Sequence, residues 1–203
     1  GPLLARFGES KVSLPGGCAW GPRPVDYHLK GFEKLGATID LKQGYILAQS
    51  EKLQGSEISF EIASVGATAN ILMAAVLAEG KTFINNAAVE PHIVQLCDVL
   101  VDMGANIRGI GTHRLEIEGV SSLRPVEVKV IPDMIEAGTF LMAGATLGEI
   151  TLTDVDPSHL NIVLEKLDHA GCDLTIDDST ITIKQNDCIR STDITTDVHP
   201  GFP

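Results

Sequence analysis

One short loop gathers the residue types best suited to chemistry in this chain. Residues 14–27 contain three prolines, three glycines, one cysteine (Cys18) and one arginine (Arg23). Neither a helix nor a central strand tolerates this mixture, because Pro removes N–H donors and Gly costs backbone entropy. Lys11 and Arg23 are close to the thiol in sequence and would favour its thiolate form. The pattern predicts a reactive cysteine on a loop, with a small buried structural cysteine as the alternative.

Three further residues near this loop and beyond it could bind a ligand. Arg23 stands between two prolines that stiffen its backbone, which suits capture of phosphate or carboxylate, although a solvated loop arginine fits equally well. Asp26 is predicted to cap a helix and could also accept a hydrogen bond from a ligand hydroxyl. Ser64 is predicted to cap a second helix, whose free N–H groups could hold an anion in addition to their structural role.

The other cysteines and the histidines suggest no metal or redox site. No pair of cysteines has C-x-x-C spacing, and the six histidines share no spacing typical of metal ligands. Cys97, on an apolar helix face, and Cys172 are expected to be small buried hydrophobes, and Cys188 is given no role. His28 is singled out because it follows the cysteine loop directly.

Composition limits the class of protein and of partner. The chain has 203 residues, of which 44% are hydrophobic and 21% charged, as in ordinary globular domains. Its net charge of −12 argues against nucleic acid or an anionic membrane as a partner. No apolar run is long enough to span a membrane. Free cysteines and opening residues unlike a signal peptide predict a cytoplasmic location, and the missing initiator Met predicts a piece of a longer protein.

The elements that must position these residues form a repeat. Three amphipathic helices each end at a glycine suited to the left-handed cap position, and these glycines are 68 and 67 residues apart: Gly36, Gly104 and Gly171. Two helices of another type, at 64–80 and 135–148, are apolar nearly all round and are predicted to be buried. Alternating or apolar runs predict strands at 81–84, 114–118, 126–130, 149–152 and 180–184.

This order of elements predicts an α/β fold built from repeated βαβαββ units. A period near 68 residues is longer than the roughly 20–50 residues of common solenoid repeats, so compact lobes with enclosed helices are expected. We predict an incomplete unit over residues 1–62, a complete one over 63–131 and a third, lacking its end, over 132–203.

Several long motifs occur in order along the whole chain: residues 14–18, 21–26, 64–68, 74–80, 86–91, 131–133 with 136–140, and 199–203. Together they resemble the UDP-N-acetylglucosamine 1-carboxyvinyltransferase family of enolpyruvyl transferases. The resemblance implies two lobes of βαβαββ units with buried helices, an inside-out α/β barrel that is incomplete here. Residues 1–131 would form most of the lobe with the cysteine loop, and residues 132–203 would begin the second lobe.

The resemblance also implies a reaction and its residues. The enolpyruvyl group of phosphoenolpyruvate would pass to the 3-hydroxyl of UDP-N-acetylglucosamine with release of phosphate, the first committed step of peptidoglycan precursor synthesis. Cys18 would be the catalytic proton donor and the target of fosfomycin, His28 would support the site, and no metal or cofactor is implied. The implied nucleotide-sugar contacts are Arg23, Pro24, Val25, Asp26, Tyr27, Ile62, Ala63, Ser64, Val65 and Gly66.

The chain also departs from the family pattern. Met134 stands where the family commonly has Arg, and Ile62 or Ala63 where some members have Lys. Family members are about twice as long, so their general base and phosphate-binding residues fall outside this chain, which is expected to be inactive alone. Two alternatives remain open: a non-catalytic nucleotide-sugar-binding or interaction module of the same fold, and the shikimate-pathway enolpyruvyl transferase.

Overall fold

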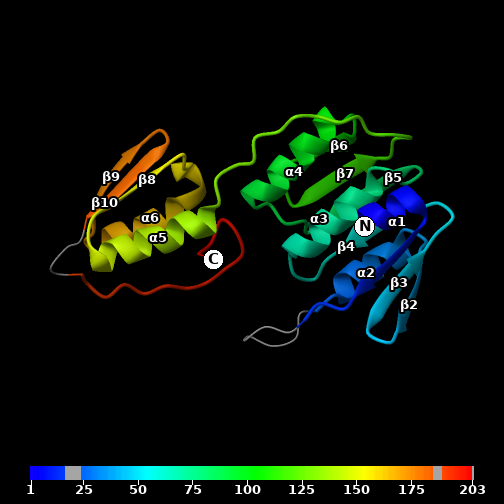
Figure 1. Cartoon of the computed structure of the whole chain (residues 1–203), viewed down its shortest axis with the longest axis horizontal. Coiled ribbons are helices and arrows are strands. Elements are labelled where there is room, and N and C mark those ends of the chain that lie inside the picture. Colours follow the sequence, from blue (N-terminus) through cyan, green and yellow to red (C-terminus); the bar gives the residue numbers. More distant parts are fainter. Residues whose placement is uncertain (17–23, 185–188, 203) are drawn as a thin grey trace. The chain divides into compact units, whose positions relative to one another are not determined.

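The chain forms two compact units, Gly1–Val128 and Lys129–Pro203 (Figure 1). The computed structural model describes residues 1–16, 24–184 and 189–202. The boundary expected from the sequence lies between residues 131 and 132. No helix among the described residues is long and apolar enough to cross a membrane.

Helices and strands alternate along both units. The first unit contains α1 (Pro2–Phe7), β1 (Glu9–Ser13), α2 (Asp26–Lys34), β2 (Thr38–Lys42), β3 (Tyr45–Gln49), β4 (Glu57–Ser59), α3 (Val65–Ala75), β5 (Lys81–Asn85), α4 (Pro91–Asp102), β6 (Asn106–Arg108) and β7 (Arg114–Glu118). The second unit contains α5 (Met134–Leu147), β8 (Ile150–Thr153), the 3-10 helix η1 (Pro157–Leu160), α6 (Asn161–His169), β9 (Asp173–Asp177) and β10 (Thr180–Lys184).

The predicted βαβαββ unit is present in full between β4 and β7. Its four strands form a sheet in the order β4-β5-β7-β6, in which β4 and β5 are parallel and the other neighbours are antiparallel. The flanking repeats form three-stranded sheets in the orders β1-β3-β2 and β8-β10-β9. Both match the β5-β7-β6 part of the complete sheet, so the described residues of these repeats lack a counterpart of β4.

The glycines that predicted the repeat end helices as expected. Gly36, Gly104 and Gly171 follow α2, α4 and α6 with φ values of 89°, 106° and 87°. A residue with a Cβ is strained in this left-handed conformation, so glycine is favoured at each position. Each glycine turns the chain from a helix into the next strand of its sheet.

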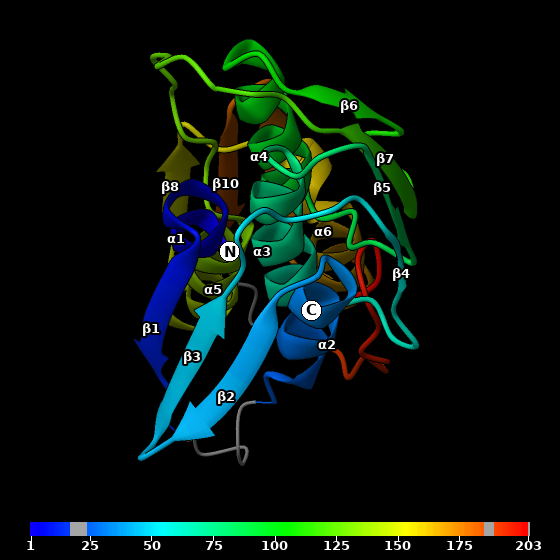
Figure 2. The same cartoon turned by 90° about the vertical axis from the view of Figure 1, so that its right-hand side faces the viewer.

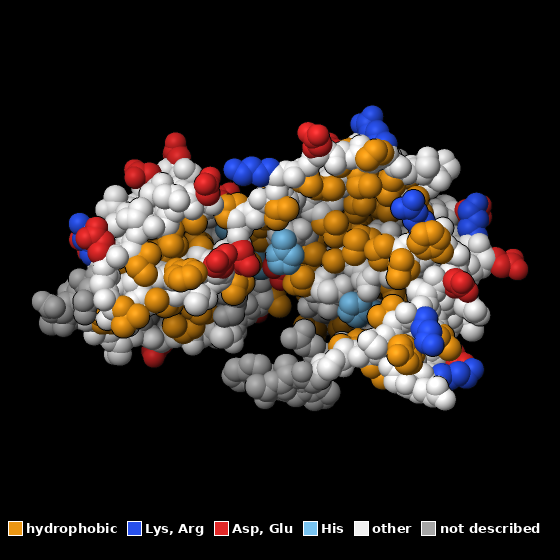
Figure 3. All heavy atoms as spheres, in the orientation of Figure 1, with side chains coloured by type: hydrophobic (Ala, Val, Ile, Leu, Met, Phe, Trp, Pro, Cys, Tyr) orange, Lys and Arg blue, Asp and Glu red, His pale blue; other side chains and the backbone are white. Residues whose placement is uncertain are grey.

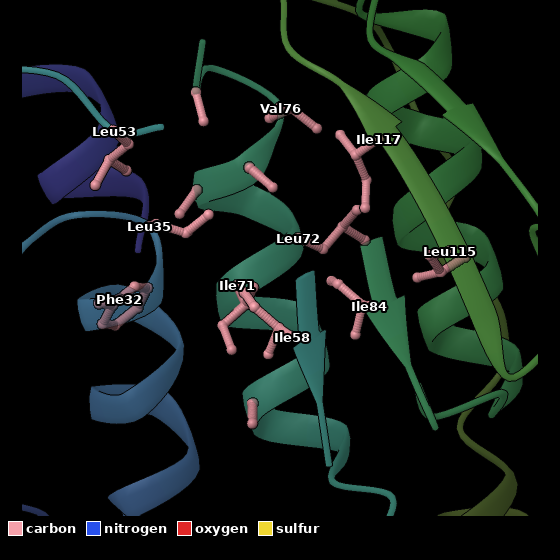
Figure 4. Close-up of a cluster of buried hydrophobic side chains, with 14 of the residues drawn as sticks. Phe32, Leu35, Leu53, Ile58, Ile71, Leu72, Val76, Ile84, Leu115 and Ile117 are labelled. Atoms are coloured by element: carbon pink, nitrogen blue, oxygen red, sulfur yellow. The ribbon is translucent and has the colours of Figure 1, made fainter. Parts of the chain in front are cut away.

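Helix α3 lies at the centre of the first unit, between other helices and the four-stranded sheet (Figure 2). Six of its eleven residues are buried: Ala67, Thr68, Ile71, Leu72, Ala74 and Ala75. It packs against α1, α2 and α4 and against β7. Its large apolar side chains meet those of α2 and the sheet in one cluster, where each buried Leu or Ile contributes about 1.5–3 kcal/mol (Figure 4). The predicted burial of this helix is confirmed.

The same prediction is wrong for α5. Its Ala137, Leu141 and Ala145 are buried, but Phe140 is exposed and Leu147 is 82% exposed. Apolar side chains gather over this helix in the space-filling view (Figure 3). Helix α3 is covered by two helices of the preceding repeat, whereas α5 packs mainly against α6, η1 and the strands β8 and β10 in the described part of the second unit.

The strand predicted at 126–130 is also absent. These residues lie in an irregular segment between β7 and α5. Val126, Val128 and Val130 alternate with charged residues, which favours a strand, but a strand also needs a backbone partner for its hydrogen bonds. No described strand pairs with them. Val130 is therefore left exposed.

Candidate functional site

Helices α2 and α3 bring together the two predicted ligand-binding segments. They run side by side in the same direction, so residues 24–28 and 62–66 lie at the same end of the pair (Figure 4). Cys18 and Arg23 lie outside the described residues. The site can therefore be built only from the first turns of these two helices and the residues that hold them.

A close contact between the helices sets their spacing. Gly31 lies inside α2, and a Cβ added there would overlap Cδ1 of Ile71 on α3. The missing side chain lets the backbone of α2 approach Ile71. At the open end of the pair, the His28 ring lies against Gly66: a Cβ on Gly66 would be 3.4 Å from both Cε1 and Nε2 of His28.

The first turn of α2 is capped one residue earlier than predicted. The carbonyl of Val25 accepts a hydrogen bond from the Leu29 N–H at 3.1 Å, so Val25 is the N-cap and Asp26 is the first helical residue. The Asp26 carboxylate is exposed and forms an ion pair with Lys30 at 3.6 Å. The predicted capping role of Asp26 is thus wrong, although its charge still suits a helix N-terminus.

An aromatic pair fixes the segment that enters α3. The rings of Tyr27 and Phe60 have centroids 5.4 Å apart and planes inclined by 43°. The side-chain amide of Asn86 donates to the carbonyl oxygen of Phe60 at 3.1 Å. Tyr27 therefore ties the start of α2 to the chain before α3, which positions the residues from Ile62 onward.

The first turn of α3 offers backbone N–H groups. Ser64 is the N-cap, as predicted, and its Oγ accepts a long hydrogen bond from the Ala67 N–H at 3.4 Å. The N–H groups of Val65 and Gly66 come too early in the helix to find an intrahelical acceptor. Such donors at the positive end of a helix dipole attract an anion. Ile62, two residues before the cap, is 67% exposed and brings no charge.

The remaining predicted residues differ in exposure. Pro24 and Gly66 are exposed, and Val25, Tyr27, His28, Ala63, Ser64 and Val65 are partly buried.

His28 is held by a residue that the sequence did not single out. Its Nδ1 lies 3.0 Å from Nδ2 of Asn70, on the second turn of α3. Burial lowers the pKa of His28, and the Asp26 carboxylate partly opposes this. The ring is therefore neutral at pH 7. Asn70 is 42 residues away in sequence and carries no local motif, so only the fold reveals the pair.

The cysteines in the described residues are structural. Cys97 and Cys172 are buried and free, as expected. Burial raises the pKa of Cys97 to about 11, and it also raises the pKa of Cys172. Neither thiol is suited to nucleophilic or acid–base chemistry near neutral pH. Within the described residues no group of His, Cys, Asp and Glu side chains could hold a metal ion.

Comparison with known sequences covers the whole chain. The family model for EPSP synthase (3-phosphoshikimate 1-carboxyvinyltransferase) matches residues 1–203. A UDP-N-acetylglucosamine 1-carboxyvinyltransferase from Prosthecochloris aestuarii is 55% identical over 206 residues, which are 100% of this chain and 48% of the relative. The enzyme of the same name from Desulfosudis oleivorans is 52% identical over 203 residues, which are 100% of this chain and 49% of the relative. The chain thus spans about half the length of these curated relatives.

Solved structures share the fold at lower identity. The enolpyruvyl transferase NikO from Streptomyces tendae matches with a TM-score of 0.77 and 23% identity, over 91% of this chain and 45% of that one. An EPSP synthase from Acinetobacter baumannii matches with a TM-score of 0.64 and 23% identity, over 90% and 45%. At this identity the likeness concerns the fold alone.

Proposed function

Since the chain belongs to the EPSP synthase (3-phosphoshikimate 1-carboxyvinyltransferase) family, we propose that it is part of an enolpyruvyl transferase whose acceptor is UDP-N-acetylglucosamine. The observation that carries this proposal is the identity of 55%, along the entire chain, to a protein named for that acceptor. Identity to the matched EPSP synthase structure is only 23%. The acceptor is therefore assigned from the sequence relatives and the family from the whole-chain match.

The proposed reaction proceeds by addition and elimination. The 3-hydroxyl of the sugar gives its proton to the general base that the resemblance places outside this chain, its oxygen forms a bond to C2 of phosphoenolpyruvate, and Cys18 gives its proton to C3. In the second step the Cys18 thiolate takes a proton back from C3, and phosphate leaves with the electron pair of its C2–O bond. The product is the enolpyruvyl ether of the nucleotide sugar. It is the first committed intermediate of peptidoglycan synthesis, which would place the protein in the cytoplasm.

The start of α3 supplies the proposed diphosphate contact. The free N–H groups of Val65 and Gly66 favour the negative charge of a diphosphate at this end of the helix. His28 Nε2 lies beside Gly66 and can add a side-chain donor. The proposed nucleotide-sugar contacts are Arg23, Pro24, Val25, Asp26 and Tyr27 before and within α2, and Ile62, Ala63, Ser64, Val65 and Gly66 before and within α3.

The division of the chain follows the same proposal. Residues 1–131 would form most of the lobe that carries the cysteine loop, and residues 132–203 would begin the second lobe.

Both substrates, UDP-N-acetylglucosamine and phosphoenolpyruvate, are anionic small molecules. Their binding is compatible with the chain's net charge of −12, because a local group of donors is sufficient.

Calorimetric titration of the 203-residue chain with UDP-N-acetylglucosamine tests the proposal. We expect binding that Arg23→Ala weakens about tenfold or more, since a hydrogen bond to a charged group contributes about 1.5–3 kcal/mol. Arg108→Ala, an exposed arginine on β6, is the matched control and should bind like the wild type. Shikimate 3-phosphate is the competing ligand. Preferential binding of shikimate 3-phosphate would replace the proposed acceptor, and binding of neither molecule would favour a pure interaction module.

Two further measurements address the chemistry. Fosfomycin should label Cys18 and leave Cys97 unlabelled, which peptide mass spectrometry can establish. Because the chain spans about half the length of its relatives, we expect no phosphate release from phosphoenolpyruvate and UDP-N-acetylglucosamine with this chain alone. Turnover comparable to that of a full-length relative would contradict this expectation.

A further inference from the structure

We propose that Asn70 is a positioning residue for the nucleotide-sugar site. Its side-chain amide would hold the His28 ring as the neutral tautomer with the proton on Nε2, the nitrogen beside Gly66. That N–H would then donate to the diphosphate of the acceptor. The ligand role of Nε2 rests on the proposed function, whereas the positioning of the ring by Asn70 can be tested without any ligand.

The orientation of the Asn70 amide determines the tautomer. Its Nδ2 faces His28 Nδ1 at 3.0 Å, and its Oδ1 faces the other way, toward Gly1 at the start of α1. A Cβ placed on Gly1 would overlap this oxygen. An amide NH₂ group can only donate, so Nδ1 must accept and cannot carry a proton. The single proton of the neutral ring is therefore on Nε2.

The surroundings of the ring keep it neutral. A proton on Nδ1 would point at the Asn70 NH₂ group and would remove the hydrogen bond. Burial lowers the pKa of His28 and so also favours the neutral ring, and Asp26 partly opposes this. Helix α3, against which the ring packs, carries no titratable side chain.

The Nε2 edge of the ring lies at the open turn of α3. A Cβ on Gly66 would be 3.4 Å from Nε2, so the ring passes directly over this residue. The N–H groups of Val65 and Gly66 are unpaired within the helix. Nε2–H thus lies next to the turn that carries two backbone donors, and the Asn70 hydrogen bond fixes the ring before a ligand arrives. Fixed donors bind an anion more tightly than mobile ones because less ordering is needed on binding.

A purely structural tie between α2 and α3 is the competing interpretation. It predicts that loss of the hydrogen bond lowers stability without a specific change in the ring or in ligand affinity. Asn70→Asp distinguishes the two, because it keeps the side-chain size but offers only acceptors. The aspartate would draw the proton of the neutral ring to Nδ1 and leave Nε2 without one. Because the aspartate also raises the pKa of His28, the variant is compared with the wild type above that pKa, where both rings are neutral.

Nitrogen-15 NMR of the histidine rings in the 203-residue chain is the first test. In the wild type we expect His28 Nδ1 unprotonated and Nε2 protonated at pH 7. In Asn70→Asp we expect a proton on Nδ1. Asn106→Ala is the matched control. Asn106 lies on the distant strand β6, and the variant loses a comparable hydrogen bond, from Asn106 Nδ2 to Glu118 at 3.0 Å. A wild-type ring protonated on Nδ1 would overturn the proposal without any variant.

Calorimetric titration with UDP-N-acetylglucosamine is the second test. We expect Asn70→Asp to weaken binding at least about tenfold, as expected for loss of a charge-assisted hydrogen bond. Asn70→Ala should weaken it less and Asn106→Ala not at all. If the wild type binds and Asn70→Asp binds with the same affinity, only the ligand role of Nε2 is refuted. Absence of wild-type binding, with the expected tautomer, would refute the proposed function and uphold the positioning of the ring.

Discussion

Replacement of Gly31 by Ala should destabilise the first unit, although alanine is the better helix former. Gly31 is buried inside α2, and the new Cβ would overlap Cδ1 of Ile71 and lie 2.8 Å from its Cγ1. Ile71 has no exposed surface and is packed near Leu35 and Ile58 (Figure 4). Neither the side chain nor α2 can yield without disturbing the core.

The expected loss follows from two opposing effects. Overpacking of a close-packed core costs about 1–3 kcal/mol. Ala in place of Gly inside a helix returns about 1 kcal/mol. The free energy of unfolding should therefore fall by about 1 kcal/mol, and α2 should shift away from α3. That shift would also move His28 relative to Gly66.

A double-mutant cycle isolates the contact. Ile71→Val removes Cδ1, the nearest atom, and should cost about 0.5–1.5 kcal/mol alone. Combined with Gly31→Ala it removes the closest overlap, while Cγ1 remains 2.8 Å from the new methyl group. The two changes should then be less costly together than the sum of the single changes, by about 1 kcal/mol. Urea unfolding followed by amide signals of the first unit measures each corner of the cycle.

Gly138 in α5 provides the matched control. It is also inside a helix, but its nearest contact for an added Cβ is Leu160 Cδ2 at 3.8 Å, an ordinary distance. Gly138→Ala should therefore stabilise the second unit by about 0.5–1 kcal/mol. If Gly31→Ala stabilised its unit in the same way, or if the cycle were additive, the close approach of α2 and α3 would be refuted. The placement of His28 beside Gly66 would lose its support.

Two further predictions concern charge and ionisation. Ile62→Lys places a cation before the first turn of α3 and should raise the affinity for UDP-N-acetylglucosamine up to about fivefold at low salt, as for an exposed ion pair. Calorimetric titration measures this affinity, with Ile62→Gln as the uncharged control. An unchanged affinity would argue against a diphosphate at that position. Because the pKa of Cys97 is raised to about 11, about one thiol in ten thousand is ionised at pH 7. Iodoacetamide should therefore modify Cys97 only in urea, and equally rapid labelling of the folded chain would contradict its burial.

The parts of the fold that depend on local pattern could be predicted. Apolar residues three and four apart, followed by a glycine, specify a helix and its end within a few residues, and this located α4 with Gly104 and α6 with Gly171. Repetition of that pattern then predicted the βαβαββ unit. The first turn of α3 was predicted for the same reason, since Ser64 precedes an apolar helix.

Features that depend on distant partners could not be predicted. The alternation at 126–130 favours a strand, but the pattern cannot supply a neighbouring strand for it. Helix α1 is only six residues long, too short for a periodic signal. The pairing of His28 with Asn70 requires two helices in contact, which no local motif records. Cys18 and Arg23 lie outside the described residues, so their roles stay predictions.

The contrast between α3 and α5 shows why the candidate site lies where two repeats meet. Both helices are apolar nearly all round, but only α3 is enclosed, because α1 and α2 of the preceding repeat cover it. The contact that encloses α3 is also the one that brings His28 on α2 against Gly66 and Asn70 on α3. One repeat thus supplies the imidazole, and the next supplies the helix N-terminus and the amide that orients the ring. Burial of the apolar helix and assembly of the proposed anion site are consequences of the same packing, so a change that separates the helices should impair both together.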